Sequence, residues 1–270
     1  MRNRAALATI AAYFILAYAF TWACHLAIPA FHLRFALGTP SASLALYLLG
    51  LGGPLFAALI LSAREGRSGL LRLFVQATRW RFSPVLYVVA FGTVGALYAV
   101  TDEVFVRRGG RIAGPWIDAS GVIPLLAAQI WVVVGEEFGW RGFALPRLQP
   151  LLGRLPAAIV IGVLWAAWHL PMFFVPGAPQ HGQSFWEFCY VITAWSIIMA
   201  ALYNIAGASL IPTMLFHAAS NGWGFVFNIP SATRPIELAL YAPVVAVALV
   251  VVHGRLGRFN RLPEQGPVLE

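Results

Sequence analysis

The 270-residue sequence has few charged side chains, no lysine and only two cysteines. Charged residues make up 10% of the chain, against about 25% in soluble domains, which excludes a water-soluble globule and a disordered chain. Cys24 and Cys189 lie in different apolar segments, which excludes a disulfide scaffold and a cysteine-based metal site. The net charge of +8 comes with no basic helix and no basic-aromatic module, so no nucleic-acid partner is expected.

The sequence is instead rich in apolar residues, which make up 60% of it and give a mean hydropathy of +0.77. Most of its apolar stretches are close to the ~20 residues that cross a bilayer as a helix. Eight of them can be placed, at about 5–30, 43–63, 83–100, 121–140, 156–175, 186–206, 208–228 and 236–253. We therefore predict an all-α fold, a polytopic bundle of about eight transmembrane helices that forms one membrane domain over residues 1–270.

The distribution of arginine predicts the orientation of this bundle. With the N-terminus in the cytosol, 13 of the 18 arginines lie on the cytosolic side and the last of them is Arg261. The outer connections hold the other five, Arg34, Arg107, Arg108, Arg111 and Arg234. Because basic residues collect on the cytosolic side, both termini are predicted to be cytosolic, in a multi-pass protein of the cell inner (plasma) membrane.

Two adjacent carboxylates end the fourth apolar stretch. Glu137 and Arg141 are spaced i, i+4, so they share a helix face and can pair. Glu136 points about 100° away and lacks that partner. Since ionisable residues inside apolar segments are costly and usually functional, one carboxylate is available as an anchor and the other for chemistry. The alternative is that both glutamates lie in the headgroup region as a solvated helix end.

The fifth stretch carries His169, one helical turn after Trp165 and two residues before Pro171. Proline disturbs the preceding turn, so backbone carbonyls near His169 are expected to be free. We expect Trp165 to form one wall of the pocket around His169. The alternative for a lone histidine here is a hydrogen-bonded residue of the bundle.

The seventh stretch carries a polar stripe of Thr213, His217 and Asn221 at i, i+4 and i+8. On a helix, His217 and Asn221 can direct two donors at one point. Gln129, seven residues before Glu136, is expected to continue the polar face of the fourth helix. The alternative is that these groups are ordinary hydrogen bonds between helices, worth less than ~1 kcal/mol each.

Taken together, these residues resemble the three motifs of the CPBP intramembrane proteases. The motifs are Glu136-Glu137-x-x-x-Arg141, Trp165-x-x-x-His169 and His217-x-x-x-Asn221. That family includes the type II CAAX prenyl endopeptidases and the bacterial Abi/bacteriocin-processing proteins. The resemblance covers about residues 120–225, which we predict to be the catalytic core. The second motif usually begins with Phe, and Trp165 replaces it here without changing the polar set.

The resemblance implies an endopeptidase that hydrolyses a peptide bond at a site inside the membrane. Carried over residue by residue, it implies that Glu136 activates water with help from His169, and that His217 and Asn221 stabilise the oxyanion. From their spacing, Glu137 and Arg141 are expected to support the site, as is Trp165. The expected partners are membrane lipid and a substrate that is a peptide or a lipid-anchored protein.

Three alternatives remain open from the sequence. Glu136, His169 and His217 would make a plausible zinc set, so the enzyme is either glutamate-dependent or metal-dependent. We favour chemistry without a cofactor, because Asn221 is a poor zinc ligand and a good oxyanion donor. The chain could also be a non-catalytic immunity or scaffold protein with the same fold, or a small transporter that uses Glu136 as a proton or cation site.

Overall fold

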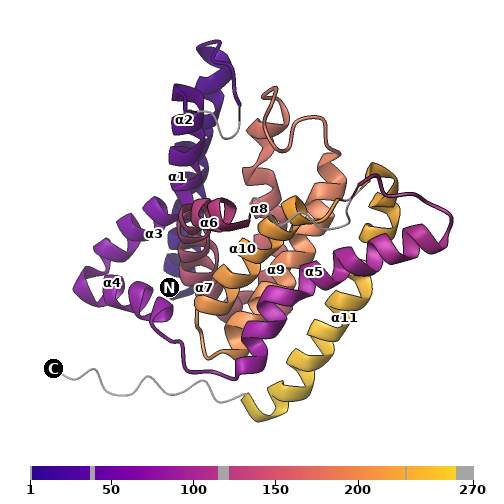
Figure 1. Cartoon of the computed structure of the whole chain (residues 1–270). Coiled ribbons are helices and arrows are strands. Elements are labelled where there is room, and N and C mark those ends of the chain that lie inside the picture. The colour runs from indigo at the N-terminus through magenta and orange to yellow at the C-terminus, as the bar shows by residue number, and fades with distance from the viewer. Residues whose placement is uncertain (1, 37–39, 115–121, 229, 260–270) are drawn as a thin grey trace.

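The computed structural model describes residues 2–36, 40–114, 122–228 and 230–259, and these form helices and no strand. Figure 1 shows the resulting helical bundle. In chain order the elements are α1 (Arg2–Ala30), α2 (Ala42–Leu51), α3 (Gly53–Arg64), α4 (Gly66–Phe74), η1 (Val75–Ala77), α5 (Pro84–Arg107), α6 (Val122–Glu137), η2 (Phe138–Ala144), α7 (Leu145–Leu152), α8 (Arg154–Trp168), η3 (Leu170–Phe173), α9 (Phe185–Ile205), α10 (Ile211–Val226), η4 (Ser231–Thr233) and α11 (Arg234–Phe259). The predicted all-α fold is confirmed, and the chain is a membrane protein.

The predicted count of eight spans is not confirmed. Four described segments are long and apolar enough to cross a bilayer: Arg4–Ala30, Pro84–Arg107, Phe185–Ile205 and Ser231–Val250. A fifth would be the pair α2 and α3, which is bent by 45°. The other three apolar stretches do form helices, but α6, α8 and α10 have 16, 15 and 16 residues. They fall short of the ~20 residues that a span requires.

The bend between α2 and α3 supports the helix that carries the two glutamates. Pro54 stands in the first turn of α3, where its missing amide hydrogen breaks no helical bond. Two glycines of the fourth stretch then approach the bend closely. A Cβ on Gly135 would lie 2.9 Å from the Leu51 carbonyl oxygen, and one on Gly139 would lie 2.4 Å from Pro54 Cβ. The segment that carries Glu136 can therefore pack this closely against the bend only because Gly135 and Gly139 have no side chain.

Directly after Glu137, the chain continues as the π-helix η2, whose residues are all buried. Its wider turn is seen where Leu145 N–H bonds to the Trp140 carbonyl, five residues back. Pro146 has no amide hydrogen to give to the Gly142 carbonyl four residues before it. Gln76 Nε2 donates to that oxygen instead, at 3.0 Å. Single π turns of this kind occur frequently at functional sites.

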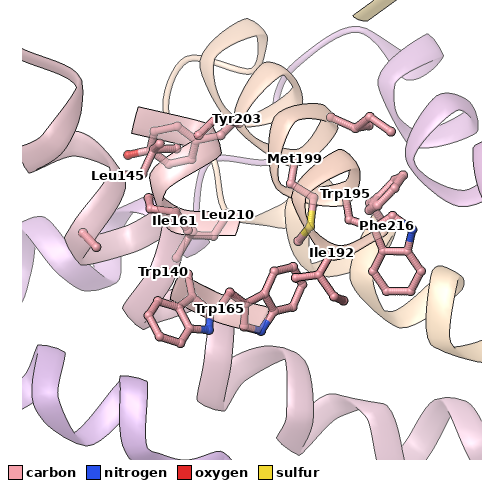
Figure 2. Packing of buried hydrophobic residues seen from close by; sticks show 14 of the residues in the cluster. Trp140, Leu145, Ile161, Trp165, Ile192, Trp195, Met199, Tyr203, Leu210 and Phe216 are labelled. Atoms are coloured by element: carbon pink, nitrogen blue, oxygen red, sulfur yellow. The ribbon is translucent and has the colours of Figure 1, made fainter. Parts of the chain in front are cut away.

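The main core lies where α8, α9, α10 and η2 meet, and it is rich in aromatic residues. Figure 2 shows Trp140, Trp165, Trp195 and Phe216 in this cluster. The outer helices are much more exposed, since only 22% of the apolar window of α1 and 17% of that of α11 is buried. These exposed apolar faces are the surface that contacts lipid.

Figure 1 shows where the connections between the helices lie. The end of α11 lies at the lower side of the figure, and the start of α1 and helix α4 lie near its middle. The connections from α1 to α2 and from α8 to α9 lie toward its upper side. The cytosolic location of both termini stays a prediction, and Arg261 lies outside the described residues.

Candidate active site

Glu136 is buried at the end of α6, with only 1% of its surface exposed. Its Oε2 accepts a hydrogen bond of 2.5 Å from Trp165 Nε1, near the end of α8. This bond joins the first and second sequence motifs. Trp165 was expected only to line the pocket, but its indole N–H donates a hydrogen bond directly to the Glu136 carboxylate.

His169 follows the last residue of α8, where the helix tightens toward Pro171. The His169 amide bonds to the Ala166 carbonyl at 3.1 Å, which leaves the Trp165 carbonyl free of its usual helical partner. The His169 ring fills that place, with Nδ1 2.8 Å from the Trp165 oxygen. A carbonyl can only accept, so Nδ1 carries the hydrogen and a neutral ring has its lone pair on Nε2. The free carbonyl predicted near His169 is thus present and fixes the tautomer.

Glu137 binds two partners through one oxygen. Arg141 donates to Glu137 Oε1 at 3.0 Å, as the i, i+4 spacing predicts, and His217 Nδ1 lies 2.9 Å from the same atom. Glu137 and Arg141 are both fully buried. The alternative that the two glutamates form a solvated helix end is therefore wrong.

Trp165 lies at the centre of these groups. The Arg141 guanidinium stands over its ring at 4.5 Å, in a cation–π contact. The His217 ring meets it edge-on, with ring centroids 5.1 Å apart, and the His169 ring centroid is 6.2 Å away. The aromatic ring therefore connects α6, α8 and α10.

Asn221 is held one helical turn beyond His217. Its Nδ2 donates to Gln129 Oε1 at 2.8 Å, so the expectation that Gln129 continues the polar face of α6 is met. This bond ties Asn221 to Gln129 and does not join it to Glu136 or His169. Thr213, the third residue of the predicted stripe, bonds to the Leu210 carbonyl at the start of α10 and takes no part in the site.

Two residues of the site's surroundings escape sequence reasoning. Trp168 is fully buried and meets the His169 ring edge-on, with ring centroids 4.7 Å apart. Tyr13 comes from α1, outside the motif region, and its ring stacks on Phe143 at 5.1 Å. Its hydroxyl would lie 2.5 Å from a Cβ on Gly139. No spacing in the sequence links Tyr13 to the motifs. The position of Trp168, directly before His169, is a signal that could have placed it near the site.

The zinc set left open by the sequence is not assembled in the described part of the chain. Within it, no three or more side chains of the His, Cys, Asp and Glu types converge so as to hold a metal ion. A cavity of about 450 Å³ lies elsewhere, near the starts of α9 and α11, and is lined by Ser184, Glu187, Arg234 and Glu237 among others. It contains none of the predicted site residues.

Comparison with known proteins shows what the motif region is similar to. Residues 118–223 match the family model described as type II CAAX prenyl endopeptidase Rce1-like. A curated protein of Methanococcus maripaludis, named CAAX prenyl protease 2, is 24% identical over 237 residues, which cover 82% of this chain and 86% of that protein. These matches confirm the family resemblance that the three motifs predict. The motif region of this membrane protein is thus similar to the type II CAAX prenyl endopeptidases.

Proposed function

We propose that the protein is an intramembrane endopeptidase that hydrolyses a peptide bond in a membrane-associated substrate. The observation that carries this proposal is the meeting of all three motifs at Trp165. Its indole donates to Glu136, its carbonyl accepts from His169 and its ring packs against His217. A carboxylate and two imidazoles from three helices are the groups that acid–base chemistry requires at one place.

Glu136 is the group we assign to the activation of water, with His169 as its helper. Glu136 Oε2 is occupied by Trp165 Nε1, which leaves Oε1 to accept a proton from a bound water. The lone pair on His169 Nε2 offers a second acceptor, because Nδ1 is committed to the Trp165 carbonyl. A positioned base of this kind contributes about 10²- to 10⁴-fold to a rate.

His217 and Asn221 are the groups we assign to stabilisation of the oxyanion. His217 can donate to an oxyanion through Nε2 while Nδ1 faces the Glu137 carboxylate, provided that the ring is doubly protonated. The Asn221 amide has two hydrogens, and only one of them is given to Gln129. A single oxyanion donor is worth about 2.7–4 kcal/mol of transition-state stabilisation.

Water must reach this site although Glu136 is almost completely covered. Five nearby side chains have buried polar atoms that find no hydrogen-bond partner in the described part of the chain: Tyr13, Glu137, Trp140, Arg141 and Trp168. Buried polar groups in proteins are normally satisfied, often by ordered water. These groups support a hydrated environment around the carboxylate, as hydrolysis requires.

The proposal also covers the substrate, the membrane and the orientation of the chain. The substrate is a peptide or a lipid-anchored protein, the membrane is the cell inner membrane, and both termini are cytosolic. No step uses a cofactor, and the zinc set of Glu136, His169 and His217 is the alternative that a measurement must separate.

The deciding experiment compares Glu136→Gln with the wild-type protein on a prenylated CAAX peptide and on its unmodified form. Glutamine can still accept the Trp165 bond, so the fold should persist while cleavage falls by about 10²- to 10⁴-fold. Glu103→Gln, at an exposed ion pair on α5, is the control and should cleave normally. Metal analysis of the same purified samples separates the glutamate-dependent from the zinc-dependent form. Undiminished cleavage by Glu136→Gln would refute the role of Glu136.

A further inference from the structure

Residues 64–81, called the surface segment below, join α3 to α5 along one edge of the bundle. The segment contains five arginines and one glutamate, which gives it a net charge of +4. It also exposes large apolar side chains: Leu71 is 58% exposed, Phe74 48% and Trp80 59%. Strong positive charge and exposed apolar groups therefore occupy the same short stretch.

Most of the positive charge is available to a partner. Arg64, Arg67 and Arg81 are exposed, and none of them pairs with a carboxylate in the described ranges. Arg81 stands over the Trp80 ring at 5.0 Å, where it still presents its charge to the surroundings. Arg72 is the exception, since it pairs with Glu65 at 2.9 Å.

The surface segment is fixed to the bundle and is not a free tail. Its buried anchor is Gln76, which donates through Nε2 to the Gly142 carbonyl of η2 at 3.0 Å. Tyr203 on α9 donates to Gln76 Oε1 at 2.6 Å, and the Leu210 amide donates to the Gln76 carbonyl at 3.0 Å. The exposed arginines are thereby held at a defined place on the molecule.

The position of the segment identifies what covers it. Helix α4 has nine residues, about 13.5 Å in length, and cannot cross a bilayer. The segment leads directly into α5, whose Val85 and Val88 are 64% and 72% exposed on the lipid-contacting surface. A short helix that exposes Arg67, Leu71 and Phe74 on one face, with Trp80 following it, is typical of an element that lies in the membrane–water interface.

We propose that the surface segment binds the headgroups of anionic phospholipids, with Leu71, Phe74 and Trp80 at the boundary of the acyl chains. This inference does not depend on the proposed protease activity. A nucleic acid or an acidic soluble protein would match the charge but would leave the apolar side chains in water. Each arginine near an anionic surface should strengthen binding by about fivefold.

The test measures lipid retained by the full-length protein, purified in a nonionic detergent, by native mass spectrometry. The protein is titrated separately with phosphatidylglycerol and with phosphatidylcholine. The wild-type protein should retain phosphatidylglycerol preferentially, and the variant R64Q/R67Q/R81Q should bind it tenfold or more weakly. Because these three arginines are exposed and without ion pairs in the described ranges, the thermal unfolding of the variant should match that of the wild type.

The matched control is R34Q/R108Q/R111Q, which removes three exposed arginines that have no ion pair among the described residues and lie outside the surface segment, and it should keep the preference. High salt should weaken phosphatidylglycerol retention by the wild type, a readout that needs no variant. At constant ionic strength, inorganic phosphate should not displace the lipid, since it offers nothing to the apolar side chains. Equal retention of the two lipids, an unchanged R64Q/R67Q/R81Q variant, or displacement by phosphate would overturn the proposal.

Discussion

The three helices that carry the motifs differ from the helices that surround them. Helices α6, α8 and α10 have 15 or 16 residues, and they bury Glu136, His169 and His217. Helices α1, α5 and α11 have 24 to 29 residues and expose most of their apolar surface. Shorter helices suffice where the ends that carry these residues are buried, although Ile130, Val163 and Phe225 on them are exposed, whereas a helix that crosses the membrane must match the thickness of the bilayer.

The comparison implies that the same substitution has a different effect in the two regions. In the interior, polar groups are desolvated and their partners are fixed, so the loss of one partner leaves the other uncompensated. On the outer helices, the same pair is screened and its side chains are mobile. Matched pairs of variants, one in the interior and one on an outer helix, therefore test whether burial decides the size of the effect.

The largest difference should come from two i, i+4 ion pairs. Arg141→Met should lower the free energy of unfolding by about 3–5 kcal/mol, because it strands the buried Glu137 carboxylate. Arg107→Met removes the partner of Glu103 on α5, where the arginine side chain is 78% exposed, and should change it by less than about 1 kcal/mol. Unfolding in mixed micelles measures both, and equal effects would show that burial does not distinguish the pairs.

Two glycines provide the second comparison. A Cβ on Gly139 would meet Pro54 and the Tyr13 hydroxyl at 2.4–2.5 Å, so Gly139→Ala should destabilise the protein by about 1–3 kcal/mol. Gly92 on α5 has open space around it, and Gly92→Ala should be neutral or stabilising by up to about 1 kcal/mol. Thermal unfolding of the two variants is the measurement. A stable Gly139→Ala protein would mean that the bend at α2 and α3 can move away from η2.

Trp165→Phe tests the hydrogen bond at the centre of the proposed site. Phenylalanine keeps an aromatic ring against Arg141 and His217 but cannot donate to Glu136. We expect kcat to fall by about 10- to 150-fold with KM nearly unchanged, since hydrogen bonds to charged groups are worth about 1.5–3 kcal/mol. Trp195→Phe, which removes a buried indole bond to Tyr241 away from the site, is the control and should keep kcat. If both variants turned over normally, Glu136 would be positioned without Trp165.

The smallest effect concerns Glu65, between α3 and α4. Partial burial raises the pKa of this carboxyl, but hydrogen bonds and charges from Arg147 and Arg72 outweigh it and bring the pKa below its usual range. The stability that this group contributes is therefore present above pH ~4.5 and is lost as the pH falls through its folded-state pKa. The loss should stay below about 1 kcal/mol because the pairs are partly exposed. Unfolding of the wild type and Glu65→Gln between pH 3 and 6 tests this, and a flat difference would contradict it.

Much of the fold could be predicted from hydropathy, because each of the eight apolar stretches does contain a helix. The number of spans could not be predicted, since hydropathy counts apolar residues and does not indicate where a helix ends. The fifth stretch is an example. Its apolar run extends over 156–175, but α8 ends at Trp168 and the chain continues as the tighter 3₁₀ helix Leu170–Phe173.

The candidate site shows the same division. Helical spacing predicted the pair of Glu137 with Arg141 and the shared polar face of Gln129. Spacing could not predict that Trp165 donates to Glu136, because the two residues are 29 apart in the sequence and lie on different helices. Nor could it predict Tyr13, whose contact with η2 depends on how α1 packs.

The π-helix has a consequence for how the chain can vary in length. Each residue removed from an α-helical path rotates everything beyond it by about 100°. The wide turn of η2 holds about one residue more than an α turn, so loss of one residue between Phe138 and Ala144 should convert it to α-helix and leave Arg147 facing Glu65, which it now meets at 2.7 Å. An added residue has no such wide turn left to absorb it, so this stretch should tolerate the loss of one residue better than the gain of one.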